Sequence, residues 1–301
     1  MKTIKILQLF FLCVFLLFSQ SCDKCIYDDL SECPQGMDFK FVSKTPCGDV
    51  LSLDGMRDLL VQVYDTKGNL VAKFDQKGIN ITPDYRITLP FSRPGTYTFA
   101  FWGMTAGAPY AKTDEASCAF IKADSPITTD LSSLFYGVLK DHKVIDRSDL
   151  GTLIDLFSIN MLPYTYRFSM EVAGLLAQKK YVVELSDDNG AYDFYGKSIG
   201  VPVIYTRSAE SYDGRIQVSL NTLKLIRDGK TMIHIREMDT GRELMKIRLE
   251  DILRGIEKQN GVTINLECVY DLNLKLQILT HQSIMVSLNQ WNFIYRGVIL
   301  R

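Results

Sequence analysis

The chain has 301 residues, with 34 basic and 35 acidic side chains, and 47% of its residues are hydrophobic. This apolar fraction is that of a folded globular protein. The near-neutral charge, with no basic run, excludes the usual electrostatic footprint of a nucleic-acid-binding protein. A chain of this length forms one large domain or two ordinary ones.

Residues 1–21 have the layout of a secretory signal. Lys2 and Lys5 precede the apolar run ILQLFFLCVFLLF, and the small polar residues SQS follow it. The run is shorter than the about 20 apolar residues that cross a bilayer comfortably. We therefore expect residues 1–21 to be removed, which leaves 32 basic and 35 acidic side chains in the mature chain.

Cys22 follows this leader directly, as the acylated cysteine does in a bacterial lipoprotein signal. Its thiol would receive a diacylglycerol, and its freed amino group an N-acyl chain. Ser19 stands where the usual motif has leucine, so ordinary secretion and an uncleaved anchor stay open as alternatives. Apart from this covalent lipid we predict no cofactor and no metal.

Five further cysteines follow Cys22 in the mature chain. An exported protein can keep disulfides, and an odd number leaves at least one thiol unpaired. Cys25 and Cys33 are close in sequence and are the predicted disulfide, whereas the apolar surroundings of Cys118 and Cys268 predict buried thiols. Cys47 is left without an assigned partner. A zinc site is disfavoured because no histidine lies near this cysteine cluster.

Strand signals dominate the first half of the chain. Residues 58–75 predict a hairpin with one buried face, in which two β-rich runs join at Lys67, Gly68 and Asn69. Further strands are predicted within 85–91, 96–104 and 132–145.

The pattern begins again after the polar residues 146–151. Strands are predicted within 165–175, 181–196, 215–226, 230–249, 268–279 and 283–300, with hairpin turns at 188–190 and 239–241. Six or seven strand signals in each half suit two antiparallel sandwiches. The expected units are the leader 1–21, a post-anchor segment 22–37, an N-terminal β-sandwich 38–150 and a C-terminal β-sandwich 151–301.

Only one segment has a clear helical pattern. Leu249, Ile252, Leu253 and Ile256 form an apolar stripe at i, i+3, i+4 and i+7, and Gly261 follows as a stop signal. This predicts a short amphipathic helix packed on the second sandwich. A helical turn is also expected within 153–163, ending before Pro163.

Several of these segments together resemble one family. They are the leader with Cys22, CIYDDLSECPQGMDFKFVS (25–43), LLVQVYDTKGNLV, RPGTYTFAFWG, SLFYG, YRFSMEVAGL and the terminal VSLNQWNFIY. The chain resembles the FimB-like fimbrial anchor lipoproteins of the Bacteroides and Porphyromonas type. The resemblance covers almost the whole chain.

The resemblance implies an all-β fold of two tandem transthyretin-like β-sandwiches. It also implies an outer-membrane lipoprotein, tethered through Cys22 and exposed at the cell surface. This protein would hold the base of a fimbrium, limit its length and contact a fimbrial shaft subunit by strand exchange. Residues 28–36, including Cys33, would lead the chain from membrane to first strand, and Trp291 and Asn292 match a terminal motif of the family.

Catalytic chemistry is not predicted. The three histidines, His142, His234 and His281, are far apart, and no nucleophile elbow, zincin motif or phosphate-binding glycine loop occurs. The acidic run SDDNGAYD lacks the ligand spacing of a calcium loop and is better explained as a hairpin turn. We therefore expect no enzyme and no small-molecule substrate.

The run 192–214 leaves a second function open because it holds four tyrosines and one phenylalanine. Loop tyrosines could stack on sugar rings, which would make the protein a surface adhesin for glycan or host protein. The simpler interpretation packs Tyr192 and Phe194 inside a strand and leaves Tyr205 and Tyr212 on an ordinary loop.

Overall fold

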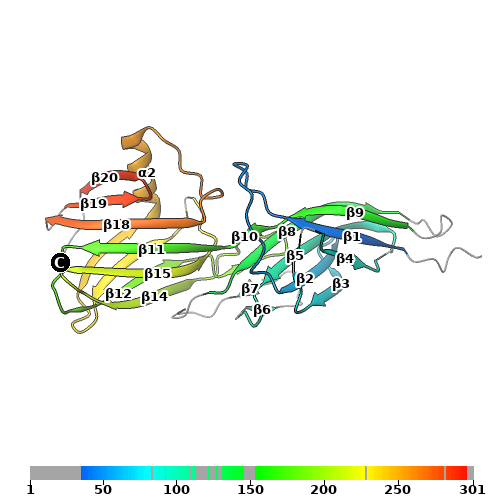
Figure 1. The fold of residues 1–301 in the computed structure, drawn as a ribbon, viewed down its shortest axis with the longest axis horizontal. Coiled ribbons are helices and arrows are strands. Elements are labelled where there is room, and N and C mark those ends of the chain that lie inside the picture. The colour runs from blue at the N-terminus through cyan, green and yellow to red at the C-terminus, as the bar shows by residue number, and fades with distance from the viewer. Residues whose placement is uncertain are drawn as a thin grey trace, which may run out of the picture.

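The computed structural model describes residues 35–82, 84–91, 93–108, 110–112, 121–122, 127, 131–145, 153–227, 229–280 and 283–296. The predicted leader, Cys22, Cys25, Cys33 and Cys118 lie outside these residues. Figure 1 shows two β-sheet bodies joined end to end along the long axis of the molecule. The expectation of an all-β fold with one short helix is confirmed for the described part of the chain.

The first sandwich has a three-stranded sheet in the order β4-β1-β9 and a five-stranded sheet in the order β10-β8-β5-β2-β3. Its strands are β1 (Gln35–Val42), β2 (Asp58–Asp65), β3 (Leu70–Gln76), β4 (Arg86–Leu89), β5 (Gly95–Met104), β8 (Leu134–Val144), β9 (Leu153–Asn160) and β10 (Leu162–Pro163). The short strands β6 (Ala111–Lys112) and β7 (Ile121–Lys122) pair with each other, and β7 also pairs with β13 of the second half.

The two central strands of the five-stranded sheet, β2 and β5, are buried on both faces. Leu59, Val61 and Val63 of β2 face the three-stranded sheet and join its core. Leu60 and Tyr64 face the other way, into a core that is continuous with the second sandwich. The predicted hairpin is confirmed, but its first strand does not have the single buried face that was expected, because a second layer covers the other side.

The second sandwich packs a sheet in the order β15-β11-β18-β19-β20 against one in the order β14-β12-β16-β17. Its elements are β11 (Thr165–Ala173), β12 (Lys180–Asp187), β13 (Ala191–Tyr192), β14 (Val203–Glu210), β15 (Arg215–Leu223), β16 (Met232–Glu237), β17 (Glu243–Arg248), α2 (Leu249–Asn260), β18 (Asp271–Thr280), β19 (Ser283–Leu288) and β20 (Trp291–Arg296). Buried and exposed side chains alternate along β11, β12 and β15, as the sequence pattern predicts for sheets with one face in the core.

Helix α2 forms where its apolar stripe predicts. Its four predicted stripe residues are all buried, and Gly261 ends the helix in the left-handed region with φ of 65°. Gly255 brings the helix close to β20, because a Cβ there would lie 2.3 Å from the Phe293 ring. No helix within the described residues is long and apolar enough to cross a membrane.

The segment 153–163 is extended rather than helical, so the predicted helical turn is wrong. Residues Leu153–Asn160 form β9, which pairs in parallel with all of β1, and β10 pairs with β8. Both strands thus belong to sheets of the first sandwich. The chain passes from the first sandwich to the second between Pro163 and Thr165 rather than at residue 151. Pairing with β1, distant in sequence, overrides the local helical signal.

The hairpin predicted at 188–190 is also wrong. After this turn the chain enters β13, which pairs with β7, while β12 pairs with β14 and β16. The predicted hairpin with its turn at 239–241 is confirmed as β16 and β17.

Candidate functional site: the junction of the two sandwiches

The described residues contain no group of three or more His, Cys, Asp or Glu side chains arranged to hold a metal ion. His142 packs edge-on against Phe157 at 4.7 Å between ring centroids, and His234 lies on β16. His281 lies outside the described residues. The candidate functional site is therefore the junction at which the two sandwiches are joined.

An aromatic cluster fills the junction. Trp102 of the first sandwich lies 4.5 Å from Tyr136, 5.8 Å from Tyr164 and 6.4 Å from Tyr192, measured between ring centroids. Trp102 and Tyr192 are completely buried. Aromatic pairs at these spacings add about 0.5–1.5 kcal/mol each to the free energy of area burial. The contact therefore resembles a domain core rather than a loose hinge.

Two tyrosine hydroxyls of this cluster hold the loop after β13. Tyr136 donates to the carbonyl oxygen of Phe194 at 3.0 Å, and Tyr164 donates to that of Gly196 at 2.9 Å. Burial raises the pKa of both phenols above the ordinary value of 10, so both remain protonated donors at physiological pH. Gly196 is required here, since its φ is 71° and a Cβ would lie 2.4 Å from the Tyr136 ring.

A stacked pair continues the junction at its edge. The ring of Phe194 lies 4.1 Å from that of Tyr64 on β2, with an interplanar angle of 18°. This contact joins the loop of the second half directly to the central strand of the first sandwich.

Backbone hydrogen bonds also cross between the halves. The chain between β5 and β8 of the first sandwich passes along the second, where β7 pairs with β13. Farther on, Ile127 donates to the carbonyl oxygen of Ile204 at 2.7 Å and accepts from the amide of Thr206 at 2.9 Å. Ile127 thus extends the edge of β14 as a short parallel bridge.

A disulfide closes the junction covalently. Cys47, in the loop after β1, is bonded to Cys268, in the loop before β18, with 5.9 Å between the Cα atoms and a sequence separation of 221. The prediction of a buried free thiol at Cys268 is therefore wrong. Sequence distance hid the pair, because only the folded junction brings these two loops together.

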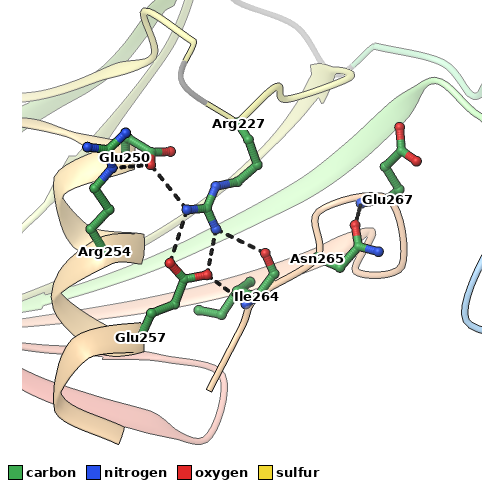
Figure 2. Close-up of polar contacts among 7 residues, drawn as sticks. All are labelled: Arg227, Glu250, Arg254, Glu257, Ile264, Asn265 and Glu267. Atoms are coloured by element: carbon green, nitrogen blue, oxygen red, sulfur yellow. Dashed lines mark hydrogen bonds and ion pairs between the residues drawn. The ribbon is translucent and has the colours of Figure 1, made fainter. Parts of the chain in front are cut away.

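The loop that carries Cys268 is itself fixed to α2 by the ion cluster of Figure 2. Arg227 reaches between two glutamates of the helix, with Nη1 2.7 Å and Nη2 3.0 Å from the Glu257 carboxylate and Nη2 3.1 Å from Glu250 Oε1. The same guanidinium donates to the carbonyl oxygen of Ile264 at 3.0 Å, and the Ile264 amide donates to Glu257 at 2.8 Å.

Glu250 is almost fully buried, and its Oε1 accepts hydrogen bonds from both Arg227 Nη2 and Arg254 Nε, the latter at 2.6 Å. The hydrogen bonds from Arg227 hold the pKa of Glu257 below its ordinary value, so this carboxylate stays charged at neutral pH. Cys268 is thereby supported by a fixed loop on one side of the bridge.

Two of the four tyrosines in the run 192–214 belong to the core rather than to a binding loop. Tyr192 is buried as expected, but Tyr205 is buried in β14, where its hydroxyl donates to Asn189 Oδ1 at 2.9 Å, so its predicted loop position is wrong. Phe194 lies beyond β13 in the loop that contacts Tyr64. Tyr195 and Tyr212 are exposed.

The junction residues Trp102, Tyr136 and Tyr164 were not singled out from the sequence. A signal was present, because β5 has large apolar side chains at both even and odd positions near its end, and such a strand is buried on both faces.

Comparisons with known proteins point to a single family. Residues 30–296 match the family model of Fimbrillin-A associated anchor proteins Mfa1 and Mfa2. The minor fimbrium anchoring subunit Mfa2 of Porphyromonas gingivalis is 24% identical over 268 residues, which cover 85% of this chain and 82% of that protein.

Solved structures share the fold. The fimbrial anchor protein Mfa2 from Porphyromonas gingivalis superposes with a TM-score of 0.74 at 20% identity, over 88% of this chain and 100% of that one. A candidate adhesin from Bacteroides thetaiotaomicron gives a TM-score of 0.65 at 20% identity, over 91% of this chain and 100% of that one.

Proposed function

Because the chain belongs to the family of fimbrillin-associated anchor proteins, we propose that it is an outer-membrane lipoprotein that holds the base of a fimbrium at the cell surface. The family match over residues 30–296 is the observation that carries this proposal. The family consists of structural anchor proteins, so the chain is not an enzyme.

The membrane attachment is assigned to Cys22. Each buried CH₂ of an acyl chain contributes about 0.8 kcal/mol to membrane binding, so two or three chains hold a protein far more firmly than one. Cys22 precedes Gln35 by 13 residues, which can span at most about 45 Å. The first sandwich therefore lies next to the membrane. Cys25 and Cys33 remain the predicted local disulfide within this stretch.

A fimbrial anchor must transmit pull from its partner to its lipid, and the arrangement of β1 suits this task. A force on Gln35 along the strand loads the hydrogen bonds between β1 and β9 in shear, so many bonds resist at the same time. The Cys47–Cys268 bridge then carries load from the loop after β1 directly to the second sandwich. Both features support the anchoring proposal.

The proposed partner is a fimbrial shaft subunit, bound by strand exchange. Unpaired sheet edges accept an added strand through backbone hydrogen bonds, and both sandwiches end in edge strands, such as β9 and β20. A subunit that is bound to the membrane and ends the fimbrium at its base would also limit the length of the fimbrium.

Substitution Cys22→Ala tests the proposal. The variant should leave the membrane fraction, and fimbriae should appear in the medium, which can be measured by fractionation and immunoblotting. Fimbriae that remain cell-bound while the variant protein is soluble would contradict the anchoring role.

A surface adhesin is the second candidate, favoured by the exposed rings of Tyr195 and Tyr212. Exposed aromatic rings can stack on sugars. Glycan arrays and host-matrix binding with the purified mature protein test it. Tight sugar binding, together with retained fimbriae in cells that lack the protein, would favour the adhesin over the anchor.

A further inference from the structure

The solvent-facing side of the five-stranded sheet in the second sandwich is divided into two halves. Near the junction it carries short polar and charged side chains: Ser169 lies opposite Ser219 on β15 and Asn273 on β18. One step farther along, Glu171 lies opposite Gln217 and Lys275 in the same way. This half is an ordinary solvated sheet surface.

The half at the far end carries Arg215 and Gln277 on either side of Ala173 of β11, and large apolar side chains on β19 and β20. Met285 of β19 lies opposite Gln277 of β18 and opposite Ile294 of β20, and Leu279 is on the same face, two residues beyond Gln277. Met285 and Ile294 thus lie side by side on neighbouring strands, and Leu279 lies farther along β18, where its pairing with β19 shifts register. The side chains of Leu279, Met285 and Ile294 are exposed by 46%, 37% and 51%.

Two turns bring further apolar side chains to the same end. The amide of Leu175 donates to the carbonyl oxygen of Gly214 at 3.0 Å, and that of Gln178 donates to Ser211 at 3.0 Å, so the turns after β11 and before β15 lie side by side. A Cβ on Gly174 would lie only 2.9 Å from the Ile278 carbonyl oxygen, which places the first turn against β18.

These turns present Leu176 and Tyr212, which are 63% and 88% exposed. We name Leu176, Tyr212, Leu279, Met285 and Ile294 the end patch. Exposed apolar side chains that gather in one region of a surface are typical of sites of protein–protein contact. The patch also joins an edge strand, β20, at which a further protein could lie against the sheet.

The position of the end patch indicates which molecule would bind it. Strand β1 starts at Gln35 and runs toward the junction parallel to β9, whose chain continues through β10 into β11 and on to the end patch. The start of β1 and the end of β18 thus lie toward opposite ends of the long axis in Figure 1. The lipid at Cys22 is confined to the Gln35 end by its short tether.

We infer that the end patch is the docking surface for the fimbrial subunit that meets the anchor, through an uncharged, apolar surface of that subunit. This inference rests on the proposed anchoring function and adds the place of contact. An incoming subunit approaches the end that points away from the membrane, and burial of aromatic and aliphatic side chains there supplies the contact.

The test compares two variants on the solvent-facing side of the same sheet, with substitutions on β18 and β20. The double variant Leu279→Lys/Ile294→Lys places charges in the end patch, whereas Asn273→Lys places a charge in the polar half. All three positions are exposed, so the folded structure should tolerate them. Melting temperature and circular dichroism of the purified proteins verify this.

Cells whose own gene is deleted are complemented with the wild type, each variant and Cys22→Ala. The patch variant should stay in the membrane fraction yet retain at least roughly tenfold fewer fimbriae, because a buried lysine opposes docking. Asn273→Lys should retain fimbriae like the wild type. Wild-type retention by the folded patch variant would overturn the inference, while shedding by Cys22→Ala would still support the anchoring function.

Analytical ultracentrifugation of the purified proteins tests whether a second copy of this chain covers the end patch instead. If the wild type is a dimer, the patch variant is a monomer and fimbriae stay attached to cells, the patch binds a second copy of this chain and the inference is wrong. Equal retention of fimbriae by Cys22→Ala and wild type would instead overturn the proposed function.

Discussion

The two sandwiches differ in what covers their five-stranded sheets. In the first, β2 and β5 have large apolar side chains on both faces, and the second half of the chain covers one of them. In the second, buried and more exposed side chains alternate along β11 and along β15 as far as Asn221, and the outer side chains remain at least partly open to solvent. The five-stranded sheet of the first sandwich is thus covered on both faces, whereas that of the second sandwich has one face open to solvent. A protein that links a membrane to a filament needs both properties.

The largest expected effect comes from the disulfide that spans both sandwiches. Removing both cysteines with Cys47→Ser/Cys268→Ser should lower the free energy of unfolding by about 4–5 kcal/mol, because a very long loop in the unfolded chain is no longer closed. Denaturant unfolding of the wild type with its disulfide intact and of the variant, without added oxidant or reductant, measures the difference in free energy of unfolding. The wild type with reductant serves as the control and should match the variant. Equal stability of the variant and the oxidised wild type would show that the bridge adds nothing to the junction.

A second prediction concerns the doubly covered sheet. Trp102→Ala should cost about 4 kcal/mol, because it leaves a cavity in a core shared by both sandwiches. The matched change on the open face is Ile294→Ala, for which we expect less than about 1 kcal/mol, since that side chain is half exposed. Urea denaturation compares the two. Similar costs for both would remove the contrast between covered and open sheets.

The smallest effect depends on pH and lies inside the second sandwich. Asp187 is buried at the end of β12 and accepts from the Thr231 hydroxyl at 2.5 Å, and burial raises its pKa from 3.8 to about 6. The folded state therefore holds this proton more tightly than the unfolded state, so this group's contribution to stability is complete below pH 3.8 and falls as pH rises to about 6.

Asp187→Asn removes this pH dependence. The stability of the variant relative to the wild type should rise by up to about 3 kcal/mol between pH 4 and pH 7. Thermal or urea unfolding across this range measures it, and Asp213→Asn is the exposed control. A difference that does not change with pH would mean that Asp187 is ionised in the fold.

Local signals in the sequence were enough for most individual elements. Gly68 and Gly241 adopt positive φ in the predicted hairpin turns, and Gly261 ends the predicted helix. Each of these features depends on contacts within a few residues, which a local pattern can report. The resemblance to anchor lipoproteins also rested on short motifs, and the family match confirms it.

Long-range partners could not be predicted in this way. The segment 153–163 has a helical pattern, but β1, more than a hundred residues earlier, draws it into a parallel pair. The chain bends at 188–190, yet the strand that follows, β13, pairs with β7 across the junction. In both cases the local preference is worth less than the hydrogen bonds and burial that a distant strand supplies.

By itself, then, the sequence determined the all-β class, the two sets of strands, the short helix and the family, because periodicity, turn chemistry and motifs are local. Only the tertiary structure decided that Cys47 bonds Cys268, that Trp102 lies in a shared core and that five exposed apolar side chains lie toward one end of the second sandwich. Each of these depends on which distant segments become neighbours. Such proximity is set by the packing of whole sheets, and no short stretch of sequence encodes it.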